Sequence, residues 1–183
     1  LFIAPEAHIL LVEDNELNLV VAKELLKPLR MQIDTAENGL QAVKMVRGSQ
    51  YDLVLMDHMM PVMDGIEAAK AIRALPEDKY QKLPIIALTA NAMVDARKEF
   101  LNAGMNGFVA KPIDFARICN QLKLWLPKDL VRDVPKAEAK KLLADDLADR
   151  EIQPEDPQMG VSFEEGVKHC GSKAALMKTI RIF

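Results

Sequence analysis

Three carboxylates stand at the ends of apolar stretches, where acidic side chains are unusual. The segment LLVED ends in Glu13 and Asp14, and the segment LVLMD ends in Asp57. An ionised carboxylate that leaves water needs a cation, because burying an unpaired charge is very costly. Carboxylates that gather in one place also repel one another unless a cation lies among them. An all-oxygen site that stays partly open to water suits Mg²⁺, so the sequence predicts a magnesium site made from these three residues.

Two more polar residues follow later apolar stretches and complete a set suited to phosphoryl transfer. Thr89 ends the segment PIIALT, and Lys111 directly follows GFVA. An aspartate can accept a phosphoryl group covalently, while a metal ion and an ammonium group neutralise the oxygens of the group being transferred. Asp57 is then the phosphoacceptor, with Lys111 and Thr89 as partners of the phosphoryl oxygens. Glu13 and Asp14 would hold the metal.

The order of apolar and amphipathic segments predicts how these residues come together. The two kinds of segment alternate as far as about residue 127, which predicts successive βα units and a parallel sheet with helices on both faces. Strands are expected at 8–12, 31–36, 51–56, 84–90 and 107–110, and helices at about 16–29, 38–47, 64–74, 92–102 and 114–126. Ligands of open parallel sheets bind at the carboxyl ends of the strands, so the polar residues after each strand should converge in one crevice.

Composition and charge argue against several classes of protein. The formal net charge is −3, and no stripe of Lys and Arg with interleaved aromatics indicates direct nucleic-acid binding. No apolar stretch is long enough for a membrane span. Cys119 and Cys170 match no metal or redox spacing, which favours reduced thiols and a cytoplasmic location; Cys119 itself belongs to an apolar stripe of the helix at 114–126. The chain opens with Leu1 and stops within an amphipathic stretch, so we expect a piece of a longer polypeptide, and the parent protein could carry a membrane anchor.

The C-terminal part has a different texture. Residues 128–159 are rich in charge and are interrupted by prolines, which predicts a charged helical linker. Residues 160–183 return to an amphipathic pattern but are too few to bury a core of their own. A mostly helical extension should therefore follow the α/β domain at 1–127.

Four segments together resemble the receiver domain of two-component response regulators, especially those within hybrid sensor histidine kinases. They are LLVEDNELN, LMDHMMPVMDG, ALTANAM and GFVAKPI, and the resemblance covers about residues 7–126. It implies a (βα)5 flavodoxin-like, doubly wound fold and a phosphorelay role in signal transduction. Asp57 would take its phosphoryl group from a histidine kinase or a histidine phosphotransfer domain. The domain would then be a regulatory phosphoacceptor with slow autodephosphorylation, and its parent chain would be a hybrid histidine kinase.

The same resemblance implies finer roles. Asp14, Asp57 and the backbone carbonyl of Met59 would bind Mg²⁺ directly, and Glu13 would bind it through water. The peptide bond before Pro112 would be cis. Thr89 and Phe108 would form the switch pair that changes the surface read by partners. Residues 160–183 resemble the opening of a histidine phosphotransfer domain and lack that family's phosphorylated-histidine segment.

Several residues have plainer interpretations. Asp64 precedes Gly65 and a helical pattern, which predicts a helix N-cap rather than a catalytic carboxylate. The side chain of His58 should point away from the acceptor face if the strand geometry continues. Phe108 could also be an ordinary core aromatic. No partner is predicted for His8 or His169.

Two other functions compete with the phosphorelay interpretation. One is an aspartyl phosphohydrolase like the haloacid dehalogenase group, which has its nucleophile on the first strand and a second Asp two residues later. Met59 occupies that second position here, which counts against it. The other is a degenerate receiver that serves only as a docking surface, which the loss of an acidic residue, the hydroxyl or the lysine would favour.

Overall fold

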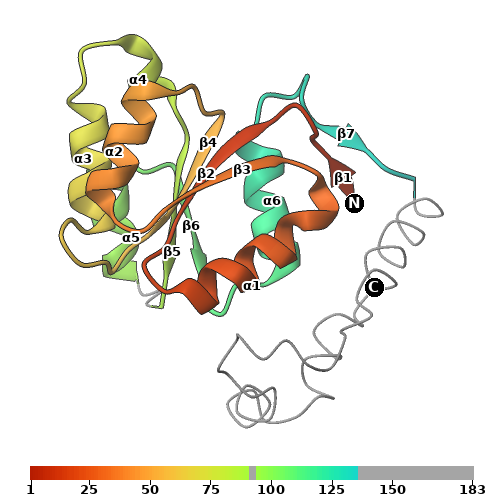
Figure 1. Ribbon diagram of the computed structural model, residues 1–183, viewed down its shortest axis with the longest axis horizontal. Coiled ribbons are helices and arrows are strands. Elements are labelled where there is room, and N and C mark those ends of the chain that lie inside the picture. Colours follow the sequence, from red (N-terminus) through yellow and green to blue (C-terminus); the bar gives the residue numbers. More distant parts are fainter. Residues whose placement is uncertain (91–93, 136–183) are drawn as a thin grey trace, which may run out of the picture. The chain divides into compact units, whose positions relative to one another are not determined.

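The centre of the fold is a parallel sheet of five strands. A computed structural model of the chain describes residues 1–90 and 94–135. The strands lie in the order β3-β2-β4-β5-β6 (Figure 1). Their bounds are β2 (His8–Val12), β3 (Gln32–Ala36), β4 (Leu53–Asp57), β5 (Ile85–Thr89) and β6 (Gly107–Ala110). The strand order reverses between β2 and β4, which is where open parallel sheets bind ligands.

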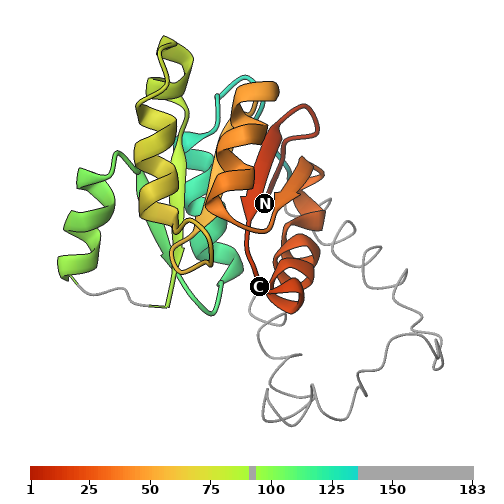
Figure 2. The same ribbon diagram turned by 60° about the vertical axis from the view of Figure 1, so that its left-hand side comes forward.

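Helices cover both faces of this sheet (Figure 1). One face packs against α1 and α6, and the other packs against α2, α3, α4 and α5. The bounds are α1 (Glu16–Leu26), α2 (Gly39–Gly48), α3 (Gly65–Arg73), α4 (Asp78–Lys82), α5 (Val94–Asn102) and α6 (Phe115–Trp125), with a 3-10 helix, η1 (Lys27–Leu29), after α1. Figure 2 shows α5, coloured green, at the left-hand edge of the domain.

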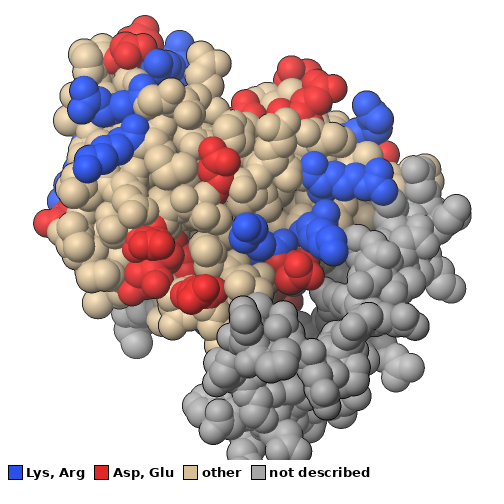
Figure 3. Space-filling model, in the orientation of Figure 1, with Lys and Arg blue, Asp and Glu red and all other residues tan. Residues whose placement is uncertain are grey.

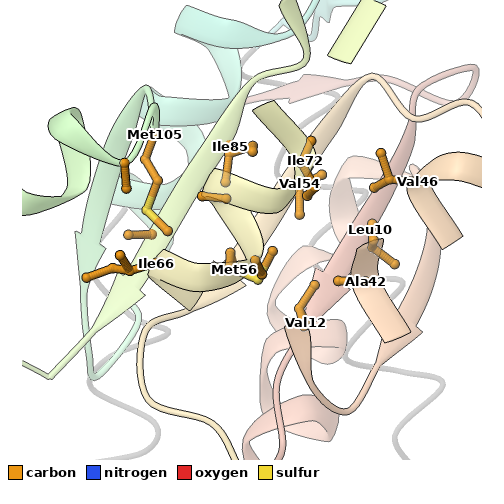
Figure 4. Packing of buried hydrophobic residues seen from close by; sticks show 14 of the residues in the cluster. Leu10, Val12, Ala42, Val46, Val54, Met56, Ile66, Ile72, Ile85 and Met105 are labelled. Carbon is orange, nitrogen blue, oxygen red and sulfur yellow. The ribbon is translucent and has the colours of Figure 1, made fainter. Parts of the chain in front are cut away.

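The two faces of each strand supply two separate cores. Leu10 and Val12 of β2 face the side of α2, where Ala42 and Val46 pack against them (Figure 4). The alternate residues of β2 pack against α1 and α6 on the other side. Every residue of β4 and β5 is buried, because both strands lie inside the sheet with helices above and below. This arrangement explains why the sequence of each strand is almost continuously apolar.

Side-chain caps fix where several helices begin. Asn15, Asn38, Asp64 and Asp114 each precede a helix, and each side chain accepts a backbone N–H from the first turn. Such a cap stabilises a helix by about 1 kcal/mol. The helix α3 has a full capping box, since Glu67 also accepts the N–H of Asp64. The prediction that Asp64 is an N-cap is therefore confirmed.

The predicted flavodoxin-like class and all of the expected strands are confirmed, but short elements were missed. The helix α4 was not predicted, nor was an antiparallel ribbon of β1 (Phe2–Ile3) and β7 (Arg132–Asp133). In this ribbon Phe2 lies opposite Asp133, and the N–H of Val134 donates to Leu1 O over 3.0 Å. The fold thus continues beyond residue 127 and joins the two ends of the described chain.

The predicted linker from residue 136 onward and the segment 160–183 lie outside the described residues. Within 1–90 and 94–135, no helix has the length and apolar character needed to cross a membrane.

Candidate functional site

The candidate site lies at the carboxyl ends of β2, β4, β5 and β6. Register brings these ends level: Val12 lies opposite Met56, Asp57 opposite Leu88, and Thr89 opposite Ala110. The next residues after β2 and β6 are Glu13 and Lys111, so each strand delivers its polar residue to the same edge. Acidic side chains gather at the lower part of the face in Figure 3, around the point where β2 ends in Figure 1.

Three carboxylates form a compact cluster there. One oxygen from each of Glu13, Asp14 and Asp57 lies within 4.8 Å of the others. Glu13 and Asp57 are only 3% and 4% exposed, whereas Asp14 is open to solvent. A hard cation such as Mg²⁺ prefers oxygen donors, uses few carboxylates and keeps several waters. The donor set and its single open side therefore fit Mg²⁺.

Lys111 places its ammonium group between two of these carboxylates. Its Nζ lies 2.7 Å from Glu13 Oε2 and 2.9 Å from Asp57 Oδ2. The backbone of the lysine is fixed as well, because its N–H donates to Thr89 O over 2.7 Å. The bond from Lys111 to Pro112 is cis, as the resemblance implied. Lys111 thus directs a positive charge at one carboxylate oxygen of Asp57.

Burial dominates the electrostatics of Asp57. Loss of water raises the pKa of its carboxyl group above the usual value, and the charge of Glu13 raises it further, while Lys111 opposes both. Burial alone would lower the pKa of the Lys111 ammonium, but hydrogen bonds to Glu13 and Asp57 outweigh that effect and raise it. One ammonium therefore compensates the cluster only in part, which leaves room for a further cation.

The loop after β4 is shaped by a close contact between Gly65 and the backbone of Asp57. A Cβ atom on Gly65 would lie 2.2 Å from the backbone oxygen of Asp57. The N–H of Gly65 also donates to His58 O over 3.0 Å. Only glycine permits this approach, which brings the start of α3 against the end of β4 and holds the acceptor loop in place.

Thr89 and Phe108 lie on neighbouring strands. Thr89 is 1% exposed at the end of β5, with its backbone carbonyl bound to Lys111. Phe108 belongs to β6 and lies opposite Ala87 of β5. Its side chain is partly exposed and packs against the core on the side of α5. The structure therefore brings Thr89 to the same edge of the sheet as Asp57. Ala110 lies opposite Thr89 on β6, and Phe108 comes two residues before Ala110.

Two asparagines that position Glu13 were not predicted. The side chain of Asn18 donates to Glu13 Oε1 over 3.0 Å, and the N–H of Asn15 donates to the same oxygen over 3.3 Å. Asn15 also caps α1. Their signal was the segment EDNELN, in which Asn15 directly precedes a helical pattern and Asn18 follows one turn later.

Two histidines behave differently from each other. The ring of His58 stacks edge-on against Phe100, with centroids 5.1 Å apart, so it packs against α5 as a side chain directed away from the acceptor. His8 was expected to have no partner, which is wrong. Its Nε2 lies 3.0 Å from Asp34 Oδ2, and Tyr51 donates its hydroxyl to the same oxygen over 2.7 Å. This cluster lies at the start of β2, at the opposite end of the sheet.

Comparison with known families decides the classification. The sequence model of the response regulator receiver domain matches residues 9–123. The chain belongs to the response regulator receiver domain family. This membership removes the haloacid dehalogenase-like alternative, whose nucleophile ends the first strand, whereas Asp57 ends β4.

Relatives of the receiver domain are long signalling proteins. Histidine kinase 5 of Arabidopsis thaliana is 36% identical in an alignment of 142 positions that covers 64% of this chain and 15% of that protein. Sensor protein GacS of Pseudomonas syringae is 33% identical over 170 residues, which are 92% of this chain and 18% of that protein. The chain thus spans less than a fifth of the length of these curated relatives.

Solved receiver domains agree with the fold and the site. The receiver domain of a sensor histidine kinase from Pseudomonas aeruginosa has a magnesium ion coordinated in its active site cleft. It matches with 41% identity and a TM-score of 0.60 over 65% of this chain and 96% of that chain. The Saccharomyces cerevisiae complex of the phosphotransfer protein Ypd1 with the Ssk1 receiver domain matches with 28% identity and a TM-score of 0.60, over 67% of this chain and 90% of that chain.

Proposed function

We propose that Asp57 of this receiver domain accepts a phosphoryl group from a phosphohistidine and relays it in signal transduction. The observation that carries the proposal is the contact of 2.9 Å between Lys111 Nζ and Asp57 Oδ2 inside a cluster of three carboxylates. An aspartate with a purely structural role would need only the ammonium group, because two further carboxylates beside it repel its charge. An acceptor gains an ammonium group and metal ligands beside the oxygens of the incoming group.

The transfer itself exchanges one bond for another. A carboxylate oxygen of Asp57 attacks phosphorus in line with the bond to the histidine nitrogen. The new O–P bond forms as the N–P bond breaks, and the histidine ring, protonated on its other nitrogen, leaves with the bonding electron pair as a neutral imidazole. The negative charge of the phosphoryl oxygens then rests beside Lys111, whose raised pKa keeps its ammonium protonated. Thr89 is proposed to donate its hydroxyl to one of these oxygens.

The metal site is assigned to Asp14, Asp57 and the backbone carbonyl of Met59 as direct ligands. Mg²⁺ would supply positive charge to the phosphoryl oxygens. Glu13 is proposed to act through water. Support for this role comes from its two oxygens, which already accept hydrogen bonds from Asn18 and Lys111. Asp14, by contrast, is exposed to solvent, which leaves its carboxylate open to a metal ion.

Thr89 and Phe108 are proposed as the conformational switch. Movement of the Thr89 hydroxyl toward the phosphoryl group would leave space behind it on β5. Phe108, on the neighbouring strand and only partly buried, is the aromatic side chain able to turn toward that space. The face formed by α5, β6 and α6 would then differ between the two states, which is what a partner can distinguish.

We also infer the setting of the domain. Its relatives are histidine kinases, which supports a parent chain of the hybrid kinase type and a histidine kinase or phosphotransfer domain as the partner. The proposed organisation keeps the receiver predicted at 1–127, the charged helical linker predicted at 128–159 and the start of a histidine phosphotransfer domain predicted at 160–183, with one change. The ribbon of β1 and β7 extends the receiver to Asp133, so the linker begins after that residue. The domain is then a substrate of its donor with slow autodephosphorylation, acting in the cytoplasm and without direct contact to nucleic acid.

The direct test is mass spectrometry after incubation with acetyl phosphate. Wild type should gain one base-labile phosphoryl group within residues 51–70 when Mg²⁺ is present, and chelation should remove the gain. Asp57→Asn should gain none. Asp64→Asn is the matched control, because asparagine is also a good N-cap and Asp64 lies outside the carboxylate cluster. A phosphoryl group that persists in Asp57→Asn, or that is lost in Asp64→Asn, would contradict the proposed acceptor.

A further inference from the structure

Both carboxylate oxygens of Glu13 are held by hydrogen bonds. Oε1 accepts the side-chain N–H of Asn18 over 3.0 Å and the backbone N–H of Asn15 over 3.3 Å. Oε2 accepts from Lys111 Nζ over 2.7 Å. Glu13 is only 3% exposed, so these donors replace the water that would otherwise surround the carboxylate. The side chain is thus held from two directions, by the start of α1 and by the residue that follows β6.

The first turn of α1 holds Asn18 in the position from which it reaches Glu13. Asn15 precedes the helix, and its Oδ1 accepts the backbone N–H of Asn18 over 3.0 Å. The backbone of Asn18 is therefore fixed by the same residue whose own N–H donates to Glu13. The cap uses the side chain of Asn15, which leaves the side-chain amide of Asn18 for Glu13. Asn18 is itself exposed, so a substitution there should spare the core.

The donors around Glu13 differ in what else they do. Lys111 also contacts Asp57 Oδ2, over 2.9 Å, so it belongs to the acceptor as much as to Glu13. The donor of Asn15 is a backbone N–H, which every residue except proline supplies. Among the hydrogen bonds between described residues, the side-chain amide of Asn18 serves Glu13 alone. Its effect on Glu13 can therefore be removed without touching the acceptor or the lysine.

The number of carboxylates that touch the metal decides which ion the cluster prefers. One oxygen from each of Glu13, Asp14 and Asp57 lies within 4.8 Å of the others, so distance alone would let one cation contact all of them. Mg²⁺ is bound by about one or two carboxylates and keeps several waters, whereas the larger Ca²⁺ takes about six to eight oxygen ligands. A third direct carboxylate would therefore favour Ca²⁺ over Mg²⁺.

We propose that Asn18 is a positioning residue that sets this ion preference by keeping Glu13 out of direct contact with the metal. To reach the ion, the carboxylate would have to give up its bond to Asn18 at a place where little water can replace it, and such a loss is costly for a charged group. Direct contact through side chains is thereby limited to Asp14 and Asp57, a number of carboxylates that suits Mg²⁺. The inference rests on the proposed metal site and extends it, because it names the group that makes Glu13 act through water.

Isothermal titration calorimetry with magnesium chloride and with calcium chloride tests the proposal on wild type and on Asn18→Leu. Leucine has nearly the shape of asparagine but no side-chain N–H, so the bond to Glu13 is lost while the cap from Asn15 remains. The ratio of Ca²⁺ affinity to Mg²⁺ affinity should rise about tenfold in Asn18→Leu, which is the equivalent of one hydrogen bond to a charged group. A role confined to folding would change both affinities alike and leave this ratio as it is.

Further variants show whether the effect passes through Glu13. In the Glu13→Gln background, Asn18→Leu should leave the ratio unchanged, because the carboxylate that Asn18 positions is no longer there. Asn18→Gln keeps the side-chain amide and should retain most of the wild-type ratio. Asn38→Leu is the matched control, because Asn38 caps α2 and lies outside the carboxylate cluster. That variant should lower the midpoint of thermal unfolding and leave the ratio unchanged.

Two outcomes would overturn this inference alone. The first is an unchanged ratio in Asn18→Leu when wild type binds Mg²⁺. The second is a shift of equal size in the Glu13→Gln background, because Asn18 would then act on the metal by another route. Wild type that binds neither ion would instead contradict the proposed metal site, and this inference would fall with it. The acetyl phosphate assay reports separately on the acceptor, so the two failures can be told apart.

Discussion

The two ends of the sheet each carry a cluster of polar groups, but the clusters are balanced differently. At the carboxyl end, Glu13 and Asp57 are almost fully buried, and Lys111 is their one close ammonium partner among the described residues. At the other end, Asp34 is 44% exposed in its side chain and accepts from both His8 and Tyr51. The cluster at the carboxyl end has more buried negative charge than the one ammonium group of Lys111 can balance. At the other end, the carboxylate of Asp34 is partly exposed to solvent and accepts two hydrogen bonds.

This difference shows where the domain gives up stability. A buried carboxylate that lacks full compensation costs free energy, and proteins keep such groups where chemistry needs them. The opposite end has no comparable strain. There the ribbon of β1 and β7 adds apolar burial and hydrogen bonds that tie together the ends of the described chain. We therefore expect substitutions at the carboxyl end to remove phosphorylation without loss of stability. Substitutions at the opposite end should lower stability and leave phosphorylation intact.

The largest effect is expected for Phe2→Ala in the ribbon. Phe2 is 1% exposed and packs in the core beneath α1 and α6, and Lys123 Nζ lies 5.7 Å from the centroid of its ring. Loss of a buried phenylalanine side chain should lower the free energy of unfolding by about 3 kcal/mol. Phosphorylation by acetyl phosphate should survive at temperatures where the variant is folded.

Urea denaturation and the mass-spectrometric assay together check this prediction. Phe2→Leu is the matched control and should cost about 1 kcal/mol, since most of the apolar volume remains. A loss below 1 kcal/mol in Phe2→Ala would mean that the ribbon is open in solution. Loss of phosphorylation in a folded variant would show that the two ends are coupled.

Mg²⁺ should give the next largest effect, and only at the carboxyl end. A ligand present at 100 times its dissociation constant stabilises the folded state by about 2.7 kcal/mol. The thermal midpoint of wild type should therefore rise with Mg²⁺ concentration, and Asp14→Asn should abolish most of the rise. Asp34→Asn should keep it. Differential scanning calorimetry measures the thermal midpoint of each protein. If the midpoint of Asp14→Asn rises with Mg²⁺ as much as that of wild type, the metal binds elsewhere.

Long elements and the acceptor residues were predictable because each leaves a strong local pattern. The buried strands are continuous apolar runs, and Glu13, Asp57 and Thr89 directly follow or end them. In a parallel sheet these positions meet whatever the detailed packing is. The fold class and the meeting point of the site were therefore open to reasoning from the sequence.

Short and long-range features were not predictable in the same way. Strands of two residues, as in β1 and β7, have no periodicity to detect. The contact of His8 with Asp34 depends on the register of β2 against β3, in which Leu10 lies opposite Asp34. The role of Asn18 likewise depends on where the first turn of α1 lies relative to Glu13. Each of these needs coordinates in three dimensions.

Replacement of aspartate by asparagine should change the free energy of unfolding in opposite directions at the two ends of the sheet. Asp57→Asn removes a buried charge whose pKa is raised by loss of water, so the metal-free variant should be more stable than wild type. Asp34→Asn weakens the acceptor of His8 and Tyr51 at a half-exposed position, so it should be less stable by about 0.5 kcal/mol. Urea denaturation in the presence of a chelator measures both, and a loss of stability in Asp57→Asn would refute this account.

The effect that is smallest at neutral pH concerns the ionisation of Tyr51, which matters only in alkaline solution. Burial raises the pKa of its hydroxyl to about 12, and the hydrogen bond and charge of Asp34 add to the increase. Below about pH 10 both folded and unfolded chains keep the proton, so the contribution of Tyr51 to stability is complete. Between about pH 10 and 12 the unfolded chain loses the proton first, and stability therefore falls as the pH rises.

Ultraviolet absorbance of tyrosinate measures this shift directly. The chain has 2 tyrosines, so Tyr80→Phe leaves Tyr51 as the only one that can titrate. At pH 11 the folded variant should keep most of its Tyr51 protonated, because the pKa is about 12. Adding Asp34→Asn should move the titration to lower pH, since it removes the charge and weakens the hydrogen bond. A midpoint near the ordinary tyrosine value of about 10 in the single variant would mean that Tyr51 is neither buried nor bound to Asp34 in solution, and the well-bonded end of the sheet would lose one of its two contacts.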